Sequence, residues 1–255
     1  MVNKVTSPLK TKFIFTPWQE SMLWSCLQGV MGTIYTDNPD NPKSAMAVLG
    51  DFCFFAGEPN IELVSYRQAW TNPDFIIMTA KEPSWNDMIE QVYGEHAKKV
   101  TRYAIKKEPD VFDEEKLQAI VNNLDPEFEL RLIDKPLYEK CLSESWSRDM
   151  VSLYFDYEQY RELGLGVVAL EGQKIVSGAS SYSSYRGGIE VEVDTHRDYR
   201  RRGLAAACSA KLILECRRRG WYPSWDAQNL WSVALAEKLG YHLDHEYTAY
   251  EVSAG

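Results

Sequence analysis

Hydrophobic positions in the first half of the chain follow helical and strand-like spacings in alternation. Met22, Leu23, Cys26 and Leu27 recur at helical steps, and a capping box at residues 16–19 predicts that their helix begins directly after Thr16. The apolar run 45–55 has the composition of one buried strand. Further strand-like segments lie at 33–36, 74–79 and 99–106, and helical segments at 61–70, 84–93 and 117–124.

The second half shows the same alternation more clearly. Its strand-like segments are 128–133, 165–170, 174–182, 189–195, 221–226 and 247–252, and its helical segments are 136–142, 203–218 and 229–239. Each half therefore has the order helix, strands, helix, strand, helix, strand, which predicts an α+β protein with an internal structural parallel. Pro109 and clustered acids interrupt the pattern, so we predict domains at 1–110 and 111–255.

Composition excludes several classes of protein. With 255 residues, 45% hydrophobic and 25% charged, the chain is neither disordered, nor a fibre, nor a small disulfide scaffold. Its 28 basic and 37 acidic residues make nucleic acid an unexpected main partner. Five cysteines without a Cys-x-x-Cys pair favour a reducing cytoplasm, and no apolar run is long enough for a signal peptide or a membrane span.

One basic segment stands out in this acidic chain, at residues 193–205. A strand is followed by a turn with three arginines and Gly203, and then by a helix. Free amides at a helix start, small residues and positive charge together suit a pyrophosphate. The alternative is a solvated helix start whose glycine only eases the turn.

The downstream sequence favours the pyrophosphate site. Arg200-x-x-Gly203-x-Ala205 and the later helix from Asn229 to Tyr241 resemble the two motifs of the GNAT superfamily of acyl-CoA-dependent N-acetyltransferases, in the expected order and at the expected distance. The resemblance covers 128–252. Around 196–204 and 225–241 the sequence is most similar to the branch that contains the zwittermicin A resistance acetyltransferase.

This resemblance implies a mixed, mostly antiparallel sheet flanked by helices, with acetyl-CoA bound where two strands splay apart. It implies that the cofactor contacts are Val193, Asp194, Thr195, Arg200, Arg201, Arg202, Gly203, Leu204, Ala205, Asn229 and Ser232. The first half then resembles a degenerate copy of the same fold. It lacks the arginines and places Glu58 where a phosphate would lie, so we expect it to bind no CoA.

Catalysis requires a group that takes a proton from the attacking amine. Strand alternation puts Glu190, Glu192 and Asp194 on one face, and carboxylates on this strand often act as base in the superfamily, so Glu192 and Glu190 are the candidates. The alternative is a solvated acidic face. The tyrosine that serves many members as acid is replaced by Ala236, which leaves Tyr241, Tyr182, Ser232 or solvent.

Acceptor contacts in this superfamily usually come from the segment that here is 146–160. Its candidate residues are Trp146, Tyr154, Phe155 and Tyr157, and aromatic rings beside carboxylates suit a cationic amine. The alternative is a lid that packs on the core. His242 and His245 fall on opposite faces of a strand, so no metal site is expected.

The predicted function is acetyl transfer from acetyl-CoA to a primary amine of a small molecule, such as an aminopolyol antibiotic or an amine metabolite. The rivals are a catalytically idle acyl-CoA sensor or interaction module, which Ala236 favours, and acetylation of a protein amine.

Overall fold

The computed structural model describes residues 1–16 and 18–253, which form two compact units. Unit 1 contains Met1–Arg102 and the chain from Glu246 onward, and unit 2 contains Tyr103–His245. The predicted boundary at 110 differs from this division by eight residues. The assignment of the last strand to the second domain also differs, because residues Ala249–Ser253 pair with Phe75–Thr79 of unit 1.

Unit 1 is built on a sheet with the strand order β1-β2-β3-β4-β5-β13-β6. Its strands are β1 (Asn3–Lys4), β2 (Thr33–Thr36), β3 (Ser44–Leu49), β4 (Phe52–Gly57), β5 (Phe75–Ala80), β6 (Ala97–Ile105) and β13 (Leu243–Ser253). Its helices are α1 (Ser21–Gln28), α2 (Ile61–Val64) and α3 (Pro83–Tyr93), with 3₁₀ turns η1 (Pro8–Thr11), η2 (Arg67–Ala69) and η3 (Gly94–His96). Residues 103–105 at the end of β6 and residues 243–245 at the start of β13 belong to unit 2.

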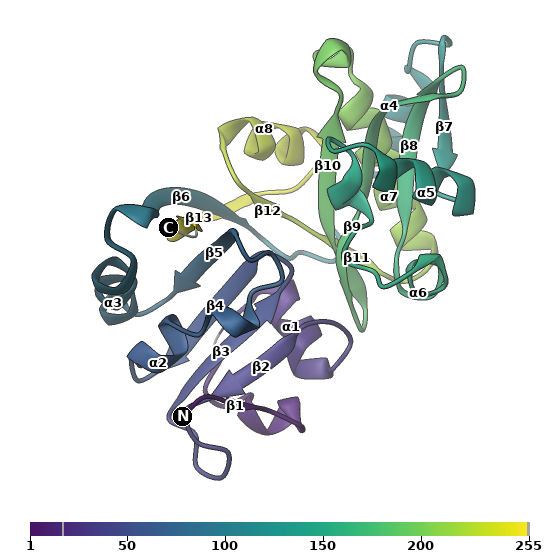
Figure 1. Ribbon diagram of the computed structural model, residues 1–255. Helices are drawn as coiled ribbons and strands as arrows, with labels where there is room; N and C mark the ends of the chain where they lie inside the picture. Colours follow the sequence, from purple (N-terminus) through teal and green to yellow (C-terminus); the bar gives the residue numbers. More distant parts are fainter. Residues whose placement is uncertain (17, 254–255) are drawn as a thin grey trace. The chain divides into compact units, whose positions relative to one another are not determined.

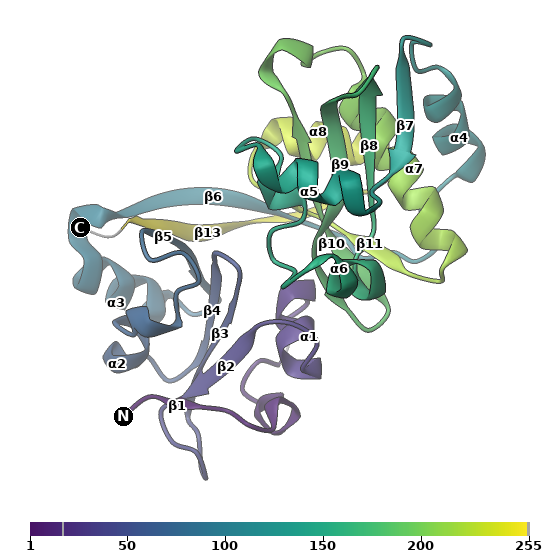
Figure 2. The same ribbon diagram turned by 45° about the vertical axis from the view of Figure 1, so that its right-hand side comes forward.

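Unit 2 is built on a five-stranded sheet with the order β11-β10-β9-β8-β7 (Figures 1 and 2). Its strands are β7 (Phe128–Leu132), β8 (Gly166–Glu171), β9 (Lys174–Tyr185), β10 (Gly188–Thr195) and β11 (Tyr222–Ser224), and β12 (Asp226–Ala227) pairs with β6. Its helices are α4 (Glu114–Asn122), α5 (Lys135–Ser143), α6 (Tyr157–Leu163), α7 (Leu204–Arg218) and α8 (Leu230–Lys238), with turns η4 (Arg148–Met150) and η5 (Arg197–Tyr199).

The two sheets repeat one topology. In unit 1, β1 to β4 pair antiparallel in sequence order and β5 is added parallel to β4. In unit 2, β7 to β10 pair antiparallel in sequence order and β11 is added parallel to β10. The predicted parallel between the halves is therefore present in the strand order, and the predicted mixed, mostly antiparallel α+β fold is confirmed.

Three local predictions were wrong for identifiable reasons. The run 45–55 is a hairpin, because Gly50 takes a φ of 57° and turns the chain inside a continuous apolar stretch. The segment 221–226 is two short strands with different partners. Helix α1 begins at Ser21, because the Thr16 hydroxyl donates to the Lys12 carbonyl of the preceding turn; Pro17 of the capping box lies outside the described residues.

The core of unit 2 follows the predicted stripe of α7. Leu204, Cys208, Leu212 and Cys216 are all buried, and α7 packs against β8, β9 and β10. All five cysteines are free thiols, and burial raises the pKa of Cys208 to about 12, so this thiol stays protonated and unreactive. This packing holds α7 against the sheet, and α7 begins after the turn at 196–203 that follows β10.

Candidate functional site

One edge of β10 has no strand partner over most of its length. Strand β11 pairs with only the first three residues, Gly188–Glu190, whereas β9 pairs with β10 as far as Thr195. After Trp225 the chain turns away, and Asp226–Ala227 pairs with β6 instead. Apart from the Thr195 carbonyl, which accepts from Arg200, the edge from Val191 onward is therefore open to a ligand that hydrogen-bonds like an added strand.

The N-terminus of α7 lies directly beyond this open edge. Its N-cap residue is Gly203, with a φ of 81°, and no side chain caps the helix or places an acid in its first turn. A Cβ built on Gly203 would meet no atom within 4 Å, so the space beside its Cα is open. Uncapped first-turn amides at the positive end of a helix of 15 residues attract an anion.

The backbone of the turn adds to this anion site. Arg201 takes a φ of 63° and is the only non-glycine residue with positive φ in the described part of the chain. Left-handed residues close to right-handed ones turn successive N–H groups toward one point, which is the geometry of an anion nest. Such a conformation costs a residue with a Cβ about 1 kcal/mol or more, and it persists where function requires it.

The three arginines of the turn have different surroundings. Arg202 forms an ion pair with Glu127 and lies 4.6 Å from the ring centre of Phe128, so its guanidinium is already engaged. Arg200 donates through Nε to the Thr195 carbonyl at 3.4 Å. Arg201 is exposed and makes no ion pair or hydrogen bond with the described residues, which leaves its guanidinium available to a phosphate.

The predicted contacts on α8 have structural roles of their own. The Asn229 side chain caps α8 by accepting from the Ser232 amide at 3.0 Å. The Ser232 hydroxyl accepts from the Trp225 indole N–H, also at 3.0 Å. This chain of bonds holds the start of α8 to the residue at which β11 turns away from β10. Cofactor contact by Asn229 and Ser232 stays a prediction.

The three carboxylates of β10 lie in different environments. Glu190 is only 4% exposed and interacts electrostatically with Tyr185, Tyr222 and Tyr241. Glu192 is half-buried and lies opposite Ser180 of β9, beyond the last pair with β11. Of the two predicted candidates for the base, Glu192 is thus the one on the open stretch of the strand.

Asp194, the last of the three carboxylates, has a strongly raised pKa. Burial, and then the charge of Asp149 on η4, raise the pKa of Asp194 from 3.8 to about 6, and the Arg200 guanidinium opposes this shift. The Asp194 carboxylate makes no hydrogen bond or ion pair with the described residues. From the sequence we expected Asp194 as a cofactor contact on the same strand face as Glu190 and Glu192, and not as a base.

The raised pKa of Asp194 predicts a pH-dependent effect on stability. Because the pKa in the folded protein lies above its unfolded value of about 4, the ionised carboxylate destabilises the folded state above pH 6. This cost disappears as the pH falls toward 4. We expect Asp194→Asn to stabilise the protein by roughly 1–2 kcal/mol at pH 8, allowing for solvent screening, and much less at pH 4.5. Thermal unfolding at pH 8 and at pH 4.5 measures this gain in stability. An equal gain at both pH values would contradict the prediction.

The candidates for the general acid are not equivalent. Ala236 and Tyr241 are fully buried, and the Tyr241 hydroxyl donates to the Pro223 carbonyl at 2.7 Å. Burial raises the pKa of Tyr241 well above its usual range, so this side chain belongs to the core. Tyr182 is buried as well, and the Ser232 hydroxyl accepts from Trp225. Solvent remains the simplest source of the proton that the departing CoA sulfur takes up.

The four predicted acceptor residues have different surroundings. Tyr154 is buried, and its hydroxyl lies 2.6 Å from Ser181 Oγ and 2.8 Å from Ser184 Oγ, so it anchors the segment to β9. The Tyr157 ring packs on Tyr138 at 5.6 Å. Trp146 contacts the His196 ring edge-on at 5.6 Å, which places it beside the turn that follows β10.

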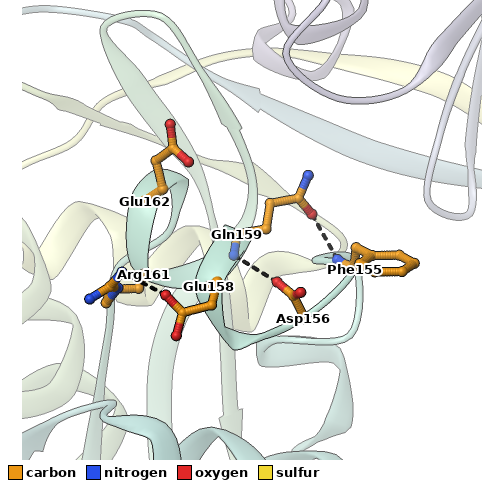
Figure 3. A pocket seen from close by; sticks show the side chains of 6 residues that line it. All are labelled: Phe155, Asp156, Glu158, Gln159, Arg161 and Glu162. Atoms are coloured by element: carbon orange, nitrogen blue, oxygen red, sulfur yellow. Dashed lines mark hydrogen bonds and ion pairs between the residues drawn. The ribbon is translucent and has the colours of Figure 1, made fainter.

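Phe155 is one of the residues that line a groove beside α6 (Figure 3). The groove has a volume of about 680 Å³, and the Phe155 side chain is 93% exposed. Its lining residues are Phe155, Asp156, Glu158, Gln159, Arg161 and Glu162. Asp156 caps α6 and Glu158 pairs with Arg161, so three of its charges are used within the helix.

Residues 1–16 and 18–253 contain neither of two other kinds of site. No group of three or more His, Cys, Asp or Glu side chains is arranged to hold a metal ion. No helix among these residues has the length and apolar character to cross a membrane.

Known proteins are similar to this chain over nearly its whole length. A family model described as GNAT acetyltransferase matches residues 12–250. The chain is 26% identical to the uncharacterized N-acetyltransferase YdfB of Bacillus subtilis, over 98% of this chain and 97% of that protein. It is 49% identical to a solved GCN5-related N-acetyltransferase-like protein from Streptococcus suis, with a TM-score of 0.91 over 96% and 98% of the two chains.

A more distant structure shows the fold alone. A tandem GNAT protein from the clavulanic acid biosynthesis pathway is 10% identical to this chain, with a TM-score of 0.59 over 100% of this chain and 99% of the other. Its similarity extends across both units, in keeping with the repeated strand order described above.

Proposed function

Since the chain belongs to the GNAT acetyltransferase family, we propose that it transfers the acetyl group of acetyl-CoA to a primary amine of a small molecule. One observation carries the proposal: the uncapped N-terminus of α7 directly follows the unpaired edge of β10. A diphosphate with an amide-rich arm attached is the ligand chemistry that this combination fits.

The proposed cofactor contacts divide between backbone and side chains. The pantetheine amides pair with the open edge at Val193–Thr195, and the diphosphate binds the amides from Arg201 to Ala205. Arg201 supplies the free positive charge, whereas Arg202 contributes through its backbone because its side chain is held by Glu127. We propose that Asn229 and Ser232 contact the cofactor from its other side.

The proposed reaction needs only groups of this chain and the two substrates. The neutral amine forms a bond to the thioester carbon, the C–S bond breaks, and the electron pair leaves with the CoA sulfur. We propose Glu192 as a proton acceptor in this sequence, with Glu190 a less exposed second candidate. No metal ion is needed in this scheme.

The proposed acceptor is a cationic small molecule. The segment from Trp146 to Tyr160 carries aromatic rings and carboxylates, and the whole chain has a net charge of -9. The similarity of 196–204 and 225–241 to the zwittermicin A resistance branch makes an amine-bearing antibiotic a specific candidate. Five buried free thiols support action in a reducing cytoplasm.

The decisive experiment is thiol release from acetyl-CoA with a panel of amines, aminopolyols, aminoglycosides and N-terminal peptides. We expect turnover with at least one small amine and none in the absence of an acceptor. Binding of acetyl-CoA without turnover on any amine would favour the sensor, which Ala236 already supports. Turnover confined to peptides would favour a protein acceptor.

We also propose that unit 1 binds no CoA. At its corresponding turn the Asn60 side chain caps α2 by accepting from the Glu62 and Leu63 amides. A Cβ on Gly57 would lie 2.0 Å from the Lys43 carbonyl oxygen, so the approach is closed. Strand β5 pairs with β4 over Phe52–Phe55, which leaves little of this strand's edge open.

The closed turn of unit 1 predicts the binding stoichiometry. Isothermal calorimetry on the full chain is expected to give one acetyl-CoA per chain. Two sites per chain would contradict the proposal that unit 1 is a degenerate copy.

A further inference from the structure

The side chain of Asp194 has no role in the acetyl transfer proposed above. Val193 packs on the core cluster that contains Leu204 of α7, so the next side chain along β10 points to the opposite face of the sheet. On that face Gly178 of β9 lies opposite Asp194, and a Cβ on Gly178 would meet the Met150 sulfur at 2.4 Å. Turn η4, from the proposed acceptor segment, therefore covers the face to which Asp194 points.

The backbone of Asp194 is held firmly while its carboxylate is left unsatisfied. The Ser177 hydroxyl lies 3.1 Å from the Asp194 carbonyl oxygen and 2.7 Å from Thr195 Oγ1. Nothing among the described residues donates to the carboxylate itself. A half-buried acid in a fixed position with free acceptor oxygens is suited to take a proton from a ligand.

The charged groups that act on Asp194 come from two neighbouring elements. Asp149 of η4 repels its negative charge, and Arg200 of the turn after β10 attracts it. On its own strand, the charged neighbour on the same face is Glu192, two residues away. Gly178, the residue of β9 opposite Asp194, carries no charge. Burial and Asp149 outweigh Arg200, which brings the pKa of Asp194 to about 6, close to neutral pH, where a general base works best.

We propose that Asp194 is a further catalytic residue, which takes the first proton from the acceptor while Asp149, a positioning residue, keeps it basic enough to do so. This inference rests on the proposed acetyl transfer. The ammonium of the bound acceptor gives one proton to Asp194 and becomes a neutral amine. The amine then forms the C–N bond, Glu192 takes the second nitrogen-bound proton, and the C–S electron pair leaves with the CoA sulfur, which is protonated from solvent.

The test compares kcat against pH for two acceptors at saturating acetyl-CoA. Propylamine is a cation throughout the relevant range, whereas methoxyamine is already neutral in mildly acidic solution and needs no first deprotonation. With propylamine we expect kcat to fall below about pH 6, the apparent pKa of Asp194. With methoxyamine this acidic limb is absent.

Three variants separate the roles of the carboxylates. Asp194→Asn removes the limb with propylamine and lowers kcat about 100-fold, but leaves methoxyamine turnover within about threefold. Asp149→Asn moves the limb to lower pH, by about half a unit, because a like charge is removed. The matched control Asp198→Asn, an exposed acid of η5, leaves the limb in place.

A second readout does not depend on turnover. In ¹³C-carboxyl NMR of the full chain, one aspartate is expected to titrate near pH 6, to vanish in Asp194→Asn and to titrate at lower pH in Asp149→Asn. A limb that survives Asp194→Asn and disappears in Glu192→Gln overturns the inference but leaves acetyl transfer intact. Absence of turnover with every amine of the larger panel overturns the proposed function, and the inference with it.

Discussion

Gly203→Asp is expected to abolish binding of acetyl-CoA at micromolar concentrations. The N-terminus of α7 has no side-chain cap, so its amides are free for a diphosphate, and the space around Gly203 is open. A carboxylate there would occupy the nest and repel the ligand. At about 4 Å and an effective dielectric constant of about 20, this repulsion is roughly 4 kcal/mol, close to a 1,000-fold loss of affinity. Calorimetric titration of the full chain measures it.

The same helix supplies a matched control at its other end. Gly220 has a φ of 68°, against 81° for Gly203, and a Cβ there also meets nothing within 4 Å. Gly220→Asp therefore adds the same charge and a similar backbone strain far from the amides of the first turn. It is expected to retain acetyl-CoA affinity within about threefold, and Gly203→Ala isolates the strain from the charge. Equal losses in both aspartate variants would mean that backbone strain, and not the anion site, explains the effect.

Features that depend on neighbouring residues could be predicted from the sequence. The strand, turn and helix at 188–218 lie where the pattern of residues indicated, because each is encoded within a few residues: alternation in β10, Gly203 at the cap and a four-residue stripe in α7. The distinct character of the turn in unit 1 was also visible, since it lacks arginines and carries Glu58. What the sequence did not reveal there is the Asn60 cap that occupies the helix amides.

Features that depend on distant partners could not be predicted. Residues 247–252 read correctly as a strand, but nothing local indicates that they pair with β5 rather than with a strand of the second half. The use of the Arg202 side chain depends on Glu127, which is 75 residues away in the chain. Tyr154 has the composition of a ligand contact, and only the buried serines of β9 show that its hydroxyl is already satisfied.

The open edge of β10 also depends on pairing with a distant strand. Trp225 lies between two short strands that pair with different neighbours, and its indole is tied to Ser232 at the start of α8. The sequence predicted one strand here, because apolar alternation does not reveal a change of partner. This change frees the edge of β10 from Val191 onward. The open edge is thus a consequence of tertiary pairing, whereas the anion site beside it is local.

Glu192→Gln is expected to lower kcat for acetyl transfer about 100-fold while acetyl-CoA affinity stays within about twofold. General-base groups typically contribute 10²- to 10⁴-fold or so to rate. The substitution keeps the size of the side chain and its place opposite Ser180, so the open edge of β10 is preserved. Pre-steady-state kinetics with calorimetry separate the two effects.

Glu190→Gln is the matched comparison for Glu192→Gln. Glu190 lies on the same strand face but beside the last pair with β11, only 4% exposed and close to three tyrosines. Glu192 is half-buried and lies beyond the last pair with β11, whereas Glu190 is buried at that pair. We therefore expect a smaller loss of kcat, below about tenfold, from Glu190→Gln. The reverse order would place the acetyl group nearer to the paired end of β10 and return the role of base to Glu190.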